Sequence, residues 1–197
     1  TSAILGVLRE DKKIDFEERP AKYIPELRFA EPYMNEQIIL KDLMAHRTGL
    51  PRHDLSWYLF PSDSDDELIK RIGFQKPFTG LRQQWYYNNW MFFLQGQIGK
   101  RITGKTWEEN VQKMFFDKLE MTRSNFKALE LPKDSDFSFG YQTDGEGLST
   151  KMDYYDIAAM SPAGAINSSV TEMSNWLITW INGGKFKDEQ IIPASYV

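Results

Sequence analysis

The sequence contains no cysteine, which excludes a disulfide framework, a thiol nucleophile and any zinc site with cysteine ligands. Its two histidines, His46 and His53, are too few for a multi-histidine metal centre. With 24 basic and 28 acidic residues the net charge is −4, so the basic excess that binds nucleic acids or anionic membranes is absent. No apolar run approaches the roughly 18 residues that a membrane span needs. We therefore expect no metal, no cofactor, no nucleic-acid partner and no membrane span.

What is present suits a packed globular domain, because 41% of the 197 residues are hydrophobic and 14% are aromatic. No internal repeat and no Gly/Ser-rich linker divides the chain, so one domain is expected. The chain opens without Met, and Ile4, Leu5 and Leu8 already recur at helical spacing. Near its end, Pro193 is placed to begin another element. We expect this sequence to be an internal piece of a longer chain.

Capping boxes predict the starts of three helices. In each box a serine or threonine precedes a glutamate by three residues, so the two side chains can satisfy backbone amides reciprocally. A long apolar helix is predicted over 89–102, and Gly104 is placed to end it. The boxes are Ser64 with Glu67, Thr106 with Glu109, and Ser169 with Glu172; the helix that follows Ser169 carries one apolar stripe of Met173, Trp176, Leu177, Trp180 and Ile181.

The remaining segments read as short helices, turns and loops. Three prolines between residues 14 and 37 predict an extended, turn-rich segment, because proline breaks a helix interior. A short helix is predicted over 38–46. Residues 125–155 are polar and rich in glycine, aspartate and aromatics, which predicts loops with short strands. The chain is therefore expected to be mostly helical.

The densest chemical signal is the aromatic run from Trp85 to Trp90, which contains a tyrosine two residues before an asparagine. At a loop-to-helix junction this spacing can place both polar tips in one cleft. A tyrosine near a cation can transfer protons as a general acid or base, and an asparagine amide can bind a substrate carbonyl. On composition alone, core packing is the favoured interpretation of these aromatics.

Three further segments favour the functional interpretation of this motif over core packing. The stretch Leu43–Pro51, the glycine Gly96 and the stretch Pro162–Ser169 stand in the order and spacing of a known pattern. In all of these the chain resembles the serine β-lactamase/penicillin-binding-protein superfamily, in the branch of class C β-lactamases, D-Ala-D-Ala peptidases and related esterases. The resemblance implies an α+β, β-lactamase/transpeptidase-like fold, of which this chain would be mostly the helical lobe with part of the α/β lobe.

The resemblance also selects between two registers of the tyrosine motif. The family pattern has a glycine nine residues after the tyrosine, and nine residues before Gly96 stands Tyr87 rather than Tyr86. Tyr87 is then implied as the proton-transfer tyrosine and Asn89 as the residue that binds a substrate amide. Tyr86 is left as a packing residue.

The same resemblance implies that other catalytic parts lie outside the sequence. The family's nucleophilic serine and its lysine, in a Ser-x-x-Lys motif, would fall six and three residues before Thr1, and its carboxylate-binding strand would lie beyond Val197. Residues 1–30 would follow the nucleophile, 38–165 would form mainly the helical lobe, and 166–197 would return toward the α/β lobe. No convincing Ser-x-x-Lys replaces the missing one, so the chain alone is expected to be inactive.

The function expected of the whole protein is a serine hydrolase that acts on a β-lactam, D-amino-acid peptide or ester through an acyl-enzyme. Its partner would be a small-molecule or peptide substrate, and family members suggest a periplasmic or extracellular location. The alternatives are a non-catalytic module that binds a peptidoglycan peptide or a glycan, and an unrelated helical interaction domain. His46 is interpreted as structural, and His53 with Asp54 as surface loop.

Overall fold

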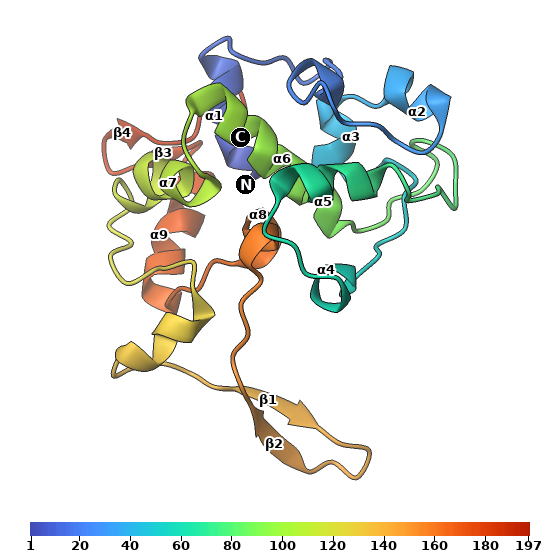
Figure 1. The fold of residues 1–197 in the computed structure, drawn as a ribbon. Coiled ribbons are helices and arrows are strands. Elements are labelled where there is room, and N and C mark those ends of the chain that lie inside the picture. Colours follow the sequence, from blue (N-terminus) through green and yellow to red (C-terminus); the bar gives the residue numbers. More distant parts are fainter.

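The computed structural model describes residues 1–197, apart from the side chain of residue 158. Helices gathered around α6 form the body, and a hairpin of β1 and β2 extends away from it (Figure 1). Short 3₁₀ turns lie at Pro20–Lys22, Ala128–Lys133 and Ala158–Met160, and a π-helical turn at Gln112–Phe116. The helices are α1 (Ser2–Glu10), α2 (Pro32–Gln37), α3 (Leu40–Met44), α4 (Ser56–Leu59), α5 (Asp65–Ile72), α6 (Asn89–Thr103), α7 (Trp107–Val111), α8 (Ser161–Gly164) and α9 (Val170–Ile181), and the strands are β1 (Gly140–Thr143), β2 (Ser149–Met152), β3 (Lys185–Phe186) and β4 (Glu189–Gln190).

The central element is α6, which contacts α1, α3, α5, α7 and α8. Asn88 caps its start, and Gly104 ends it at a φ of +69°, a left-handed conformation that glycine adopts without steric cost. Within the helix, the missing side chain of Gly96 makes room for a neighbour, since a Cβ there would lie 2.3 Å from Cγ of Pro162 in α8. The glycine nine residues after Tyr87 therefore allows α8 to pack directly on α6.

Helix α1 lies along α6 and runs in the same direction. Ser2 donates a hydrogen bond to Gln95 at 2.6 Å, and two residues later Ile4 lies against Gly99, four residues further along α6. Residues distant in sequence complete its surroundings. The Thr1 hydroxyl donates to the Pro162 carbonyl at 2.5 Å, and Gly6 lies directly against the ring of Tyr196.

The capping boxes predicted at Ser64 and Thr106 are confirmed as helix starts. Each hydroxyl accepts a hydrogen bond from the backbone N–H three residues on, and the Thr106 box is reciprocal. At Ser64 and Ser169 only half of the box forms. At Ser169 the Glu172 carboxylate instead accepts from the Arg123 N–H at 2.7 Å and the Ser124 hydroxyl at 2.6 Å. Long-range hydrogen bonds have replaced the local one there.

The proline-rich segment contains more helix than predicted. Pro32 stands at the first position of α2, where the absent N–H costs nothing, and Pro20 begins a 3₁₀ turn in the same way. The helix predicted over 38–46 is shorter than expected, because α3 covers only Leu40–Met44. The short strands predicted within 125–155 are present as β1 and β2, paired antiparallel with Tyr141 opposite Lys151.

The apolar stripe of α9 divides between the core and solvent. Trp176 and Trp180 pack against the core, whereas Leu177 is 57% exposed and Ile181 82% exposed. Val170, at the start of the helix, is 88% exposed. Among the helices that the structure describes, none is long and apolar enough to cross a membrane.

Candidate active site

The site is built where two loops run side by side at the start of α6. The first loop follows α3 and includes His46 and Gly49, and the second covers residues 78–87. The loops are joined by three backbone hydrogen bonds: Phe78 N–H to Gly49 O, Arg82 N–H to Arg47 O and Tyr86 N–H to His46 O. Gly49 has a φ of +80°, and a Cβ there would lie 2.4 Å from the Thr79 carbonyl. Only glycine allows the loops to approach this closely.

An ion pair between the buried carboxylate of Asp42 and the partly exposed Arg82 holds the second loop against α3. Arg82 donates from Nε and Nη2 to the two carboxylate oxygens of Asp42, both at 2.8 Å, and Asp42 is 3% exposed. Asp42 also accepts the Ile39 N–H at 3.0 Å. Bonding to Asp42 raises the pKa of the Arg82 guanidinium above its ordinary value. The pair fixes the loop five residues before Tyr87.

His46 contacts the backbone on both sides of Tyr87. Its carbonyl accepts the Tyr86 N–H, and its ring Nδ1 accepts the Asn88 N–H at 3.0 Å. The His46 ring also lies on the Tyr87 ring, with centroids 4.5 Å apart, and stacks on Phe92 at 5.0 Å. Burial, with a smaller contribution from the Arg52 charge, lowers the pKa of His46 below its ordinary value. A neutral ring with the proton on Nε2 fits these contacts.

The two asparagines of the motif have different environments. Asn88 is fully buried: its Oδ1 accepts the Trp90 N–H at 2.8 Å, and its Nδ2 donates to the Pro51 carbonyl at 2.8 Å. Both polar atoms of its side chain therefore bond within the fold, and its complete burial closes them to a substrate. Asn89 is half-buried, and its Nδ2 donates to Asp54 at 3.2 Å. An asparagine with remaining hydrogen-bonding capacity thus stands at position 89.

Tyr87 is half-buried, and its hydroxyl has no hydrogen-bond partner among the described residues. The guanidinium carbon of Arg52 lies 4.9 Å from the centroid of the Tyr87 ring. Arg52 is itself held by Asp54, with Nε 2.5 Å from the second carboxylate oxygen. Asp54 therefore holds Asn89 with one oxygen and Arg52 with the other.

The structure brings His46 against Tyr87, and Asn89 lies two residues further along at the start of α6. The other residues considered from the sequence have structural contacts. His46 has the structural contacts that its position at a helix end suggested, and Tyr86 packs on Phe78 with centroids 4.7 Å apart. Asp54 and Arg52 were missed as site residues. Their one sequence signal was their position directly after the Leu43–Pro51 stretch.

The described residues contain one Ser-x-x-Lys, at Ser124 and Lys127, and it lies in a loop rather than a helix. The Ser124 hydroxyl is buried and donates to Glu172, while Lys127 is exposed. This pair lacks the one-turn helical spacing that turns serine and lysine toward one site. No group of three or more His, Asp or Glu able to hold a metal ion occurs in the described part of the chain.

Comparisons with known proteins agree with the resemblance. A sequence model described as Beta-lactamase matches residues 1–195. The teichoic acid D-alanine hydrolase of Staphylococcus aureus is 29% identical over 157 residues, which cover 76% of this chain and 35% of that protein. The first curated relatives are matched over only 27–35% of their own lengths, so the chain spans about a third of them.

Solved structures share the fold at lower identity. A D-stereospecific amidohydrolase from Streptomyces sp. superposes with a TM-score of 0.81 at 15% identity, over 98% of this chain and 59% of the other. The octameric penicillin-binding protein homologue from Pyrococcus abyssi gives 0.79 at 23% identity, over 98% of this chain and 45% of the other. The expected β-lactamase/transpeptidase-like α+β fold is confirmed.

Proposed function

The chain belongs to the beta-lactamase family, and from this membership we propose that it is part of a serine hydrolase that cleaves an amide or ester through an acyl-enzyme. Tyr87 would transfer the proton and Asn89 would bind the substrate. The observation that carries the proposal is that Tyr87 has an unpartnered hydroxyl beside Asn89, while the competing Asn88 is consumed by the fold. Like the relatives named for D-alanine and D-stereospecific hydrolysis, the protein would act on D-aminoacyl bonds.

The direction of α1 supports a nucleophile that precedes it. α1 and α6 run parallel, and Ser2 of α1 lies beside Gln95 of α6. Residues that precede α1 in a continuing helix would therefore lie beside residues nearer the N-terminus of α6. A helix rises about 1.5 Å per residue, so a serine six residues before Thr1 would lie about 9 Å along the axis from it. In this proposal the serine would lie level with the start of α6, where Asn89 stands.

The Asn89 amide is suited to orient a substrate. Nδ2 carries two hydrogens, and Asp54 accepts only one, so the other can donate to a substrate carbonyl. Its Oδ1 can accept a substrate amide N–H. Because Asp54 is also paired with Arg52, the amide is held in a defined orientation before substrate arrives.

Acylation of the whole protein tests this function. A fluorescent penicillin and a p-nitrophenyl ester of D-alanine are added, and intact mass spectrometry follows the adduct. We expect a covalent acyl adduct or ester turnover. Both should be lost when the serine expected six residues before Thr1 is replaced by alanine. Absence of both reactions in a folded whole protein would contradict the hydrolase. Saturable binding of a peptidoglycan stem peptide, without acylation, would favour the non-catalytic binding module.

His46 variants are expected to show that this residue positions Tyr87. His46→Leu leaves the Asn88 N–H buried without an acceptor, which costs about 1–3 kcal/mol and should slow acylation about 10- to 100-fold. His46→Asn can present its Oδ1 in place of Nδ1 and should retain most activity near pH 7. Rates are measured by stopped-flow acylation, with circular dichroism to check folding.

The pH profile distinguishes positioning from general destabilisation. The fold lowers the pKa of His46, so it favours the neutral ring. This adds to the stability of the folded protein at pH values above the unfolded pKa of about 6.5, and the gain is lost as the pH falls through the lowered pKa. A proton added at Nδ1 removes the acceptor for Asn88. We expect an acid limb in the wild-type rate that His46→Asn lacks; an unchanged limb would refute the role of His46.

A further inference from the structure

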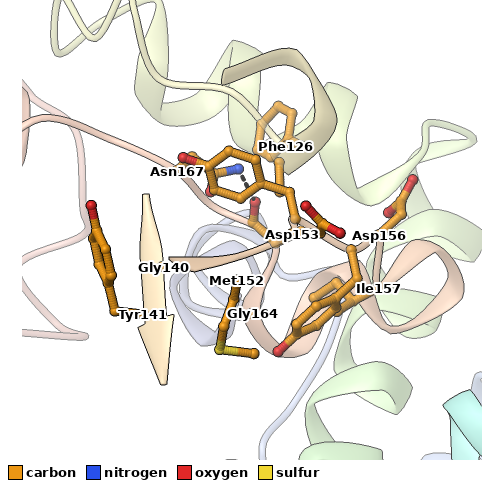
Figure 2. A pocket seen from close by; sticks show the side chains of 13 residues that line it. Phe126, Gly140, Tyr141, Met152, Asp153, Asp156, Ile157, Gly164 and Asn167 are labelled. Atoms are coloured by element: carbon orange, nitrogen blue, oxygen red, sulfur yellow. Dashed lines mark hydrogen bonds between the residues drawn. The ribbon is translucent and has the colours of Figure 1, made fainter. Parts of the chain in front are cut away.

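A cavity lies between the β1–β2 hairpin and α8, and its lining includes no residue of the loops that hold Tyr87. It has a volume of about 320 Å³, and Gly164 and Ala165 form part of its wall. Figure 2 shows Tyr141 on one side of the cavity and two aspartates on the other. Its aromatic and charged lining residues are Phe126, Tyr141, Tyr154, Tyr155, Asp153 and Asp156.

The lining has the chemistry of a cation site. Its two charged side chains, Asp153 and Asp156, are both carboxylates, and four aromatic rings accompany them. The face of an aromatic ring attracts ammonium groups, and a nearby carboxylate adds to the attraction. We propose that this cavity binds the ammonium group of an organic amine.

The aromatic walls are held in place by their own contacts. Phe126 stacks on Phe116, with centroids 5.1 Å apart and planes 3° apart. The Tyr155 ring meets Tyr58 of α4 edge to face at 5.2 Å, and the Tyr154 hydroxyl donates to the Ser138 carbonyl. A wall that is ordered before binding loses little entropy when a ligand arrives.

The one lysine of the hairpin contacts an aromatic ring that is not part of the cavity lining. Lys151, which pairs with Tyr141 across the strands, places its Nζ 3.3 Å from the centroid of Phe139. Phe139 and Lys151 both lie outside the lining, so no cationic side chain belongs to the cavity wall. An incoming ammonium would meet aromatic rings and the Asp153 carboxylate in the cavity, together with Asp156, which also interacts within the fold.

The amine could be part of the substrate or a separate molecule. A D-aminoacyl ester carries a free ammonium, and only this assignment rests on the proposed function; binding of an amine does not. Using the whole protein, titration of benzyltrimethylammonium against intrinsic fluorescence measures binding directly. Turnover of D-alanine methyl ester, compared with its N-acetyl derivative, asks whether the substrate's own amine uses the site.

We expect Asp153→Asn and Asp156→Asn each to weaken benzyltrimethylammonium binding about five- to tenfold. Glu146→Gln removes one charge from the exposed hairpin turn outside the cavity and should leave binding unchanged. If the substrate's amine binds here, the same variants raise the KM for the free-amine ester but not for the acetylated ester. If only the probe responds, the site serves a separate amine.

Equal binding by wild type and both aspartate variants, or no binding by a folded wild type, would overturn the cation site. An inactive protein that still binds the probe in an Asp153-dependent way would instead refute only the hydrolase.

Discussion

Replacing Tyr87 by phenylalanine in the whole protein is expected to slow acylation by about 10²- to 10⁴-fold, the usual contribution of a positioned acid or base. The change removes one hydroxyl that no other described residue uses, so the fold should be unaffected. The ring contacts to His46 at 4.5 Å and Arg52 at 4.9 Å do not require the hydroxyl. The acylation rate and the thermal unfolding midpoint are measured on the same preparation.

Tyr86→Phe is the matched control. Tyr86 is the adjacent tyrosine, it packs on Phe78, and in the competing register it would be the catalytic one. We expect the Tyr86→Phe protein to acylate at nearly the wild-type rate. A large loss in Tyr86→Phe with little loss in Tyr87→Phe would show that the register was assigned to the wrong tyrosine.

Replacing Arg82 by leucine is expected to lower the free energy of unfolding by about 2–3 kcal/mol. Loss of one partner from a fully buried pair costs about 3–5 kcal/mol, because the remaining charge stays buried without compensation. Arg82 is 40% exposed, so water can partly solvate the Asp42 carboxylate, and the lower estimate applies. Urea denaturation of the whole protein measures the change.

Lys41→Ala is the control for Arg82→Leu, because Lys41 precedes Asp42 in α3 and pairs with Glu17 on the surface. With side chains about 60% exposed on both sides, that pair should contribute less than about 1 kcal/mol. Asp42→Asn combined with Arg82→Leu should recover part of the lost stability, since no buried charge remains. Equal effects of Arg82→Leu and Lys41→Ala would refute the importance of burial at Asp42.

Local signals predicted helix starts well and long-range partners poorly. The Thr106–Glu109 box formed because both partners lie within one turn, where no other element competes. Glu172 has the same local pattern, yet Ser124 and Arg123, about 50 residues away, took its carboxylate. Periodicity likewise found the apolar stripe of α9 without revealing which part of it the rest of the chain covers.

In the candidate site, too, local sequence signals were informative and long-range contacts were not. A resemblance based on spacing singled out Tyr87 and Asn89, because both belong to one short motif and its glycine. Asp54 reaches Asn89 from 35 residues away, and His46 reaches Asn88 from 42, so no local pattern could join them. That Asn88 is the buried asparagine depends on its hydrogen bond to the Pro51 carbonyl, a contact that only the folded chain shows.

The position of α1 has a consequence for the newly made chain. Its partners include Pro162 and Tyr196, so the surface on which it rests is synthesised long after it. At about 5–20 residues per second, α1 waits roughly 10–40 s on the ribosome with Ile4, Leu5 and Leu8 uncovered. Chaperones that bind apolar helices could therefore meet this segment before its partners are made, and slower translation before residue 160 would lengthen its exposure to proteases and aggregation.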